Sequence, residues 1–406
     1  MDLTSIDVVS NAVYLDDVPF EQFAVLRQLA PVHKQQVPDP DLVPEAWVVS
    51  SQEHIRTVSI DTETFSSQRA GIRLGRVRTA EGQKVQAGNF IMLDDPEHRR
   101  LRRMVSKGFT ARVVRTFAEH FGEVAVQAVD KALAAERLEF VEQIAVQLPT
   151  LAICELLGMP PHAQAQVLEW SNAIVGLNDP DGGGSPASAG AAVVELGRYA
   201  LELAEQRRAA PREDLLSKLA TAEGEDRLSD EELVGFTLLL LVAGNESTRN
   251  TTSHAVIGLA QHPDQLHWLR EDLPGRLDGA VEEMIRWASP LTYMARTATR
   301  DVELGGQVIR EGDRIAMFYC SANRDEAVFA DPDSFRLDRD DAHLHMSFGV
   351  GSHSCMGSSL ARVELKAVFN ALLQRVDQIE IDGPVTRLRS SWVRGVKQLP
   401  IRMRRI

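Results

Sequence analysis

One helical stretch, from Ser229 to Gln261, constrains the fold of this chain more than any other feature. Ser229 and Glu232 form the S-x-x-E pattern of a capping box, which marks the start of a helix. Periodic apolar residues then continue as far as His262 and Pro263, where the proline stops the pattern. At 1.5 Å per residue the stretch spans roughly 45–50 Å. It therefore predicts a single helix that crosses a whole domain.

The remaining pattern is also mostly helical. Helical periodicity dominates from about residue 96 to residue 258, with breaks at Pro160-Pro161, at 179–186 and at Pro211. Further helices are expected at 20–30, 52–61, 274–287 and 357–376, and short strands at 46–51, at 292–320 and in hairpins after residue 379. Residues 67–90 have little periodicity and predict a long loop. We find no repeat and no linker, so we expect one domain over residues 1–406, mainly α with a smaller β portion.

Composition excludes several classes of function. The 406 residues carry a formal net charge of −14, which argues against nucleic acid as a partner because phosphate binding needs a basic surface. The 3 cysteines are too scattered for a disulfide scaffold, and no CxxC pair is present. The acidic N-terminus lacks the pattern of a signal peptide, and the most apolar run, 236–243, is too short to cross a bilayer. We therefore expect a cytoplasmic protein that uses no membrane.

Cys355 stands in the run Phe348-Gly-Val-Gly-Ser-His-Ser-Cys-Met-Gly357, just before the last predicted helix. Gly349 and Gly351 let the backbone turn tightly and approach a flat partner. The N–H groups at the start of the following helix favour the thiolate over the thiol. A thiolate held on a glycine-rich loop is what an axial ligand of haem iron requires. The run therefore predicts Cys355 as the iron ligand of a haem.

Two other interpretations of Cys355 were weighed. A lone cysteine is most often a buried, inert side chain. The neighbouring His343, His345 and His353 could join Cys355 as nitrogen and sulfur ligands of zinc. The zinc interpretation lacks a helical ligand motif, and two of the histidines lie upstream of the loop. The eight-residue pattern from Phe348 to Cys355, followed by Gly357, favours haem over both.

The run FGVGSHSCMG resembles the haem-binding loop of the cytochrome P-450 monooxygenases, and the resemblance extends over nearly the whole chain. It implies the cytochrome P-450 fold and a non-covalent haem b with Cys355 as its thiolate ligand. Glu283 and Arg286 lie one helical turn apart and can pair on one face. In the family, a third residue, which Arg339 matches, completes a buried network that fixes the region behind the haem loop.

The middle of the long helix reads Ala243-Gly-Asn-Glu246-Ser247-Thr248. Small residues at Ala243 and Gly244 leave room over a cofactor, although a glycine there is also compatible with simple helix packing. The hydroxyl of Ser247 can bond back to the carbonyl of Ala243. The resemblance implies an acid–alcohol pair, Glu246 and Ser247, that delivers protons during oxygen activation. The family usually has threonine where Ser247 stands, and the neighbouring Thr248 is the alternative donor.

Basic residues near the start of the helical region suggest two further roles. His98 and Arg102 are four residues apart and share a helical face, where they can bind the carboxylates of haem. Arg296 and His353 match the other haem propionate contacts of the family. Along the neighbouring face, the stripe of Arg99, Arg103 and Lys107 suggests docking of an acidic electron donor. A basic helix face exposed to solvent is the plain alternative.

The substrate cavity is expected from apolar segments that the resemblance brings together. They are the loop from residue 69 to residue 92, the stretch 239–244, residues 292–294 and the C-terminal turn 390–393. The predicted contacts are Leu239, Val242, Thr292, Met294, Trp392 and Val393. Such segments are also typical of an ordinary core.

The implied reaction inserts one atom of O₂ into an apolar substrate, with two electrons from NAD(P)H passed through a ferredoxin and its reductase. The stretches AGNESTRN and RLRSSWVRGVKQLPIRM resemble bacterial members that act on sterols, terpenoids or lipid chains. A peroxide-driven hydroxylase is the alternative among haem enzymes, although it does not need Glu246 and Ser247. A non-catalytic haem-binding protein would have no use for a proton relay. A helical scaffold with a structural cysteine is the remaining alternative.

Overall fold

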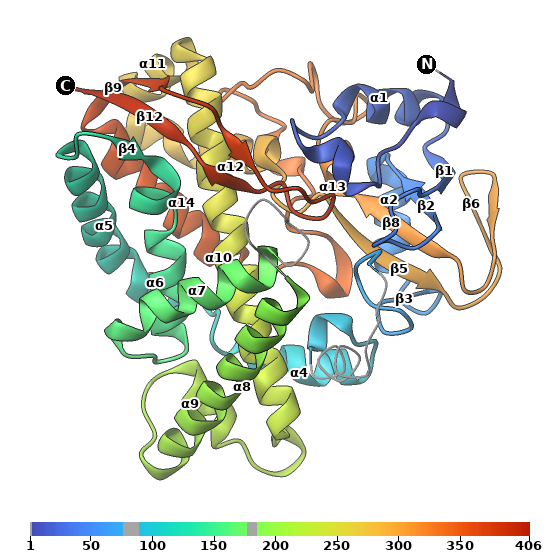
Figure 1. Ribbon diagram of the computed structural model, residues 1–406, viewed down its shortest axis with the longest axis horizontal. Coiled ribbons are helices and arrows are strands. Elements are labelled where there is room, and N and C mark those ends of the chain that lie inside the picture. The colour runs from blue at the N-terminus through green and yellow to red at the C-terminus, as the bar shows by residue number, and fades with distance from the viewer. Residues whose placement is uncertain (1, 76–88, 177–184) are drawn as a thin grey trace.

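The computed structural model describes residues 2–75, 89–176 and 185–406. Helices dominate this part of the chain (Figure 1). They are α1 (Phe20–Leu29), α2 (Gln52–Ile60), α4 (Glu97–Ser106), α5 (Ala111–Leu133), α6 (Gln147–Leu156), α7 (Gln164–Val175), α8 (Pro186–Ala209), α9 (Leu215–Ala220), α10 (Asp230–Gln261), α11 (Pro263–Glu271), α12 (Leu273–Ala288), α13 (Tyr319–Ala322) and α14 (Ser358–Leu373). The mainly α prediction is confirmed.

The helix α10 is the predicted long helix, and it crosses the helical part of the molecule (Figure 1). Ser229 and Glu232 form the capping box. Acidic residues occupy the first turn, where their negative charge interacts favourably with the positive end of the helix dipole. Its second half is buried on nearly every side. Three hydroxyls there, of Thr251, Thr252 and Ser253, donate to carbonyls four residues earlier. These bonds satisfy polar groups that would otherwise be unpaired in the core.

Strands form a smaller part beside the helices. The largest sheet has the order β1 (Val32–Gln36), β2 (Glu45–Val49), β8 (Arg314–Phe318), β5 (Tyr293–Ala298) and β3 (Phe65–Ser66). Only β2 and β8 pair in parallel within it. The other described strands are β4 (Leu138–Glu139), β12 (Pro400–Arg405) and β9 (Val376–Ile381) in one sheet, and the pairs β6 (Val302–Leu304) with β7 (Gln307–Ile309) and β10 (Thr386–Arg387) with β11 (Val396–Gln398).

The helical core has two parts that meet at α10. One part lies between α5, α12 and α14 and includes Phe121, Met284 and Phe369. The other lies between α6, α7, α8 and α9 and includes Trp170 and Phe236. Because α10 contributes to both parts, its middle is held between two packed layers. None of the described helices is both long and apolar enough to cross a membrane.

Some predicted boundaries were wrong. The helix α12 ends at Ala288, where Ser289 adopts a left-handed conformation with φ of 40° one residue before Pro290. Pro263 ends α10 but also begins α11, because proline is well tolerated in the first turn of a helix. The last helix ends at Leu373 because β9 begins at Val376. Most of the predicted loop 67–90 and of the turn at 179–186 lies outside the described residues.

Candidate active site

A cavity of about 360 Å³ lies where the middle of α10 faces the loop before α14. Its walls come from segments far apart in the sequence: residues 72–73, 89–92, the C-terminal end of α7, the middle of α10, the start of β5, the loop 347–357 and the turn 390–393. Most of the lining side chains are apolar. The polar ones gather around Cys355, on α10 and near Trp392, and they are described in turn below.

The loop that carries Cys355 has the predicted tight turns. Gly349 has φ of 65° and Gly351 has φ of 78°, a region that L-residues rarely adopt. A Cβ on Gly351 would lie 2.8 Å from the carbonyl oxygen of Ser59, so the loop could not approach α2 with a larger residue. The backbone N–H of Cys355 donates to the carbonyl of Phe348 at 2.8 Å. This closed loop presents Cys355 to the cavity.

The groups around the Cys355 sulfur have opposing effects on the pKa of its thiol. The cavity exposes Cys355, but the protein around its sulfur still keeps water away, and this desolvation is the largest influence and raises the pKa of the thiol. The N–H groups of Gly357 and Ser358 and the guanidinium groups of Arg102 and Arg362 lower it. The helix start thus acts in the predicted direction, but burial outweighs it in the protein alone. A metal ion held at the sulfur would supply the positive charge that favours a thiolate there.

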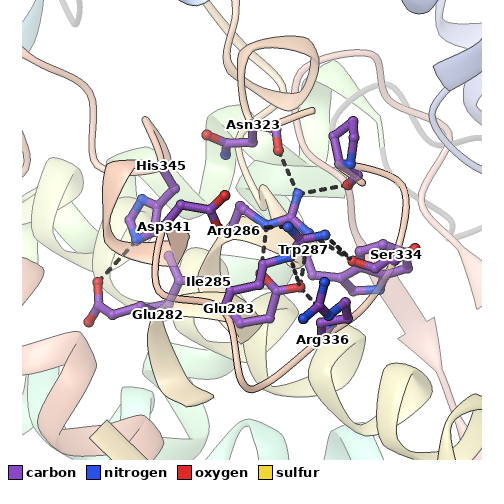
Figure 2. A network of polar contacts seen from close by, with 12 residues as sticks. Glu282, Glu283, Ile285, Arg286, Trp287, Asn323, Ser334, Arg336, Asp341 and His345 are labelled. Carbon is purple, nitrogen blue, oxygen red and sulfur yellow. Dashed lines mark hydrogen bonds and ion pairs between the residues drawn. The ribbon is translucent and has the colours of Figure 1, made fainter. Parts of the chain in front are cut away.

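Behind the loop, α12 anchors a fully buried ion network (Figure 2). Arg286 Nε donates to Glu283 Oε2 at 2.6 Å, and Arg286 Nη2 donates to Oε1 at 2.9 Å. Arg339 Nε donates to the same Oε1 at 3.3 Å. Arg286 also donates to the carbonyl of Asn323 at 2.7 Å, and the amide of Asn323 donates to Ser347 Oγ. The network therefore reaches the residue that precedes Phe348.

Four donors gather at one edge of the cavity. His98, Arg102 and His353 line it, and Arg296 is almost fully buried beside them. The rings of His98 and His353 stack with their centres 3.9 Å apart. Burial and the charges of Arg296, His98 and Arg102 lower the pKa of His353 to about 2. Three buried atoms there have no hydrogen-bond partner in the described part of the chain: His98 Nε2, His353 Nδ1 and Arg296 Nε.

Unpartnered buried polar atoms are costly unless a bound group satisfies them. Here these atoms lie around the guanidinium groups of Arg102 and Arg296. Such a cluster suits a flat ligand that carries two carboxylates. The sulfur of Cys355 lines the same cavity. The residues therefore fit haem: Cys355 would ligate the iron, and His98, Arg102, Arg296 and His353 would bind the propionates. When bound, haem supplies oxygen activation, and a thiolate ligand favours cleavage of the O–O bond.

On α10, Ala243 and Ser247 face the cavity one turn apart. Ser247 Oγ donates to the carbonyl of Ala243 at 2.7 Å, the hydrogen bond expected from the sequence. A Cβ at Gly244 would collide with the side chain of Ile153 on α6. Gly244 therefore also serves close packing of two helices, which was the plain alternative for this residue. Thr248 is buried and lines the cavity as well.

Glu246 is buried on the same helix and held away from Ser247. Its Oε2 accepts from Arg249 Nη2 at 2.6 Å, and its Oε1 accepts from Ser171 Oγ at 3.4 Å. Burial raises the pKa of Glu246, while Arg249 opposes that shift. Arg249 is fixed in turn, because its Nη1 donates to Asn172 Oδ1 at 2.9 Å. The carboxyl group is therefore tied to α7, although Glu246 also lines the cavity.

The apolar contacts are placed as expected, with one exception. Leu239, Val242, Met294, Trp392 and Val393 all line the cavity. Thr292 does not: it is fully buried, and its hydroxyl donates to the carbonyl of Ser391. The prediction of Thr292 as a substrate contact is therefore wrong, because its side chain faces the backbone of the 390–393 turn.

Two cavity residues were missed by sequence analysis. Glu364 on α14 is buried, its Oε2 has no partner, and burial raises its pKa to about 8. Its position four residues after the apolar Leu360 could have marked it as facing inward. Arg73 lies in the predicted loop but carried no motif. In the described chain no group of three metal-ligating side chains forms, and His345 contacts Glu282 instead of Cys355.

The fold and the cysteine-centred cavity define a haem-thiolate enzyme, and comparison with known proteins names its family. The cytochrome P450 family model matches residues 192–391. A steroid C26-monooxygenase of Rhodococcus jostii is 36% identical over 97% of this chain and 84% of the relative. A methyl-branched lipid omega-hydroxylase of Mycobacterium tuberculosis is 36% identical over 95% of this chain and 91% of the relative.

A solved structure gives the same answer. A cytochrome P450 of Mycobacterium marinum in complex with pseudoionone superimposes with a TM-score of 0.91, at 34% identity over 98% of each chain. The chain belongs to the cytochrome P450 family. It is a P450 monooxygenase with haem b and a cysteine thiolate as the axial ligand, as the resemblance implied.

Proposed function

We propose that this enzyme hydroxylates a steroid or another largely apolar lipid. The observation that carries the proposal is the cavity itself, whose walls are mostly apolar and which includes Cys355. Apolar walls contribute binding in proportion to the apolar area that the substrate buries. The names of the relatives agree, because one is a steroid monooxygenase and another a lipid hydroxylase.

In this proposal Glu246 and Ser247 transfer protons into the cavity. Ser247 Oγ faces the cavity and is held by the carbonyl of Ala243, so its lone pairs remain available to an incoming proton. Glu246 is a suitable source because burial raises its pKa. It donates toward Ser247 once its bond to Arg249 opens, and a new proton reaches it from the α7 side.

Electrons come from NAD(P)H through a ferredoxin and its reductase, and the ferredoxin docks on the stripe of Arg99, Arg103 and Lys107. The three side chains are exposed by 80%, 65% and 59%. They share two carboxylates: Asp95 accepts from Arg99 at 2.6 Å, and Asp226 lies 2.8 Å from Arg103 and 3.8 Å from Lys107. Exposed pairs of this kind are weak, so an acidic partner competes for the cations.

The docking step is tested by charge reversal. Arg103→Glu should slow reduction by an acidic ferredoxin, and the loss should shrink as salt screens the charges. Arg198→Glu on α8, an equally exposed cation, is the matched control and should have little effect. Slowing by both variants alike, or a loss that does not depend on salt, would place the docking surface elsewhere.

The substrate class is tested with the haem-loaded enzyme. Steroids and methyl-branched lipids should shift the haem absorption band, and the shifted mixtures should yield hydroxylated products with NAD(P)H, ferredoxin and reductase. A panel of small polar aromatic compounds is the control and should give neither result. Turnover driven by hydrogen peroxide alone, with none from the ferredoxin system, would favour the peroxide-driven alternative.

A further inference from the structure

One cation in the cavity wall is not explained by haem or by the proton relay. Arg73 lines the cavity and is only partly buried. Its guanidinium carbon lies 4.3 Å from the ring centre of Trp392, which also lines the cavity. No hydrogen bond or ion pair joins the Arg73 side chain to a described residue. A guanidinium stacked on an indole still presents its N–H edge, so Arg73 is free to bind an acceptor.

Trp392 offers a second donor beside it. The indole Nε1 is buried and has no hydrogen-bond partner among the residues that the structure describes. Buried indole N–H groups usually find an acceptor, so this one marks a place where a ligand atom is expected. The Arg73 guanidinium thus lies over a ring whose N–H is also unpartnered within the described chain.

The backbone around both donors is fixed. Arg314 Nη2 donates to the carbonyls of Gly71 and Arg73, at 3.0 Å and 2.6 Å. Ala295 N donates to the carbonyl of Ile72 at 2.8 Å. On the other side, Thr292 N donates to the carbonyl of Trp392 at 3.0 Å. Preorganised donors of this kind bind without a large ordering cost.

Among the described residues of the cavity wall, no negative charge balances that of Arg73. Of the two carboxyl groups that line it, Glu246 is paired with Arg249. Glu364, with a pKa raised to about 8 by burial, is mostly neutral at pH 7. Burial lowers the pKa of Arg73, as expected for a cation without a counter-charge.

Arg73 is also separate from the donors assigned to haem. Its side chain stacks on Trp392, whereas the rings of His98 and His353 stack on each other. The pKa of Arg73 itself responds to Tyr293, whose hydroxyl accepts from the backbone of Leu74. The wall next to Arg73 continues in Ile72, Leu291 and Val393, which are apolar.

We propose that Arg73 and the indole N–H of Trp392 form an anion subsite that binds the carboxylate of the substrate. This proposal rests on the proposed function and narrows it: the substrate is a lipid or steroid acid, with an apolar body along the cavity and one carboxylate at Arg73. A carboxylate matches the planar edge of a guanidinium with two parallel hydrogen bonds, which neither an alcohol nor an ester can do.

The test compares matched ligands on the haem-loaded enzyme, followed by the shift of the haem absorption band. One pair is hexadecanoic acid and hexadecan-1-ol, and the other is a steroid side-chain acid and its methyl ester. The two pairs distinguish a fatty acid from a steroid acid as the carrier of the carboxylate. In at least one pair the acid should bind about tenfold or more tightly than its neutral partner, as expected for a charge-assisted hydrogen bond.

Variants assign the preference to the subsite. Arg73→Gln should weaken binding of the acid by about tenfold and leave the neutral partner within about twofold. Trp392→Phe keeps the ring and removes the N–H, and should give a smaller loss in the same direction. Arg112→Gln, the same change at an exposed position on α5, should leave both ligands unaffected.

The contrary results are distinct. Equal affinity for acid and neutral partner, or an acid preference that survives Arg73→Gln, overturns the anion subsite and leaves the proposed function standing. Loss of haem from Arg73→Gln assigns Arg73 to the cofactor and overturns the subsite as well. Absence of a shift with every member of both pairs overturns the subsite together with the proposed substrate class.

Discussion

Replacing Glu283 by Gln removes the only carboxylate that contacts both Arg286 and Arg339 among the described residues. The carboxylate and the Arg286 side chain are 0% exposed. Breaking a buried ion pair by neutralising one partner costs about 3–5 kcal/mol, because the remaining charge stays buried without compensation. The amide would also set its own N–H donors against those of Arg286. We therefore expect a loss of about 3–5 kcal/mol of unfolding free energy.

The loss is measured by thermal unfolding of the haem-loaded enzyme, followed by far-UV circular dichroism and by haem absorption. The melting temperature should fall by roughly 4–6 °C, because the unfolding entropy of a chain of 406 residues is large. Haem should be released at a lower temperature too, since the network reaches the haem loop through Asn323 and Ser347. The control is Glu202→Gln, which breaks an exposed pair with Arg198 at 3.0 Å. Such pairs contribute about 0.3–0.5 kcal/mol, so the control should melt nearly as the wild type does.

A second variant examines the cause. If the cost of Glu283→Gln comes from stranded positive charge, then Arg286→Met should cost less in that background than in the wild type. Equal costs in the two backgrounds would mean that the two residues do not interact energetically. A Glu283→Gln protein that melts like the Glu202→Gln control would refute the reasoning entirely.

Three more outcomes follow from the site. Cys355→Ser should abolish the red-shifted band of the reduced, CO-bound haem while circular dichroism stays helical, and an unchanged band would remove Cys355 as the ligand. Ser247→Ala should keep haem but lower the product formed per NAD(P)H and raise peroxide. The loss of product formation should be about 10²-fold at most if water replaces part of the relay. Thr248→Ala is the control, and the reverse pattern would assign the proton relay to Thr248. Glu364→Gln should change the free energy of unfolding little near pH 4.5 and raise it by about 3 kcal/mol at pH 7. The reason is that the pKa of Glu364 is raised to about 8 in the folded state, so the wild type loses stability as the pH rises from 4.5 to 8. Denaturation at both pH values checks the sign.

The parts of the fold that sequence analysis predicted well are those with local signals. The helix α10 has a capping box at its start and a proline just after its end, so its boundaries need no distant contact. The turns at Gly349 and Gly351 could likewise be predicted from the glycines in the sequence around Cys355. Because both segments line the cavity, the centre of the site could be predicted from short stretches of sequence.

The parts that were missed depend on distant partners. Helix packing was one interpretation of Gly244, but nothing near it in the sequence indicates that its partner is Ile153 of another helix. Thr292 is an ordinary polar residue in a strand until Ser391 takes its hydroxyl. Arg73 looked like one of several arginines in a polar loop. Its meaning appears only when Trp392 lies under its guanidinium and no carboxylate of the cavity faces it.

The roles of two neighbouring residues on α12 show how such contacts hold the cysteine loop from both flanks. Consecutive residues on a helix point about 100° apart. Glu283 turns toward Arg286 and, through Asn323, fixes Ser347 at the beginning of the loop. Glu282 turns toward α14, where Arg362 donates to it at 2.6 Å and 2.7 Å. The Arg362 guanidinium in turn covers the ring of Phe348 at 4.6 Å.

Both contacts act on the segment that positions the iron ligand. Burial opposes ionisation of Glu282, but the hydrogen bonds from Arg362 and His345 hold its pKa at about 2, so it stays charged at neutral pH. The two carboxylates lie on one helix. Glu283 holds Arg286, whose bond to the carbonyl of Asn323 leads on to Ser347, and Glu282 holds Arg362, which covers Phe348. Charged hydrogen bonds on α12 thus support the side chains that contact the loop.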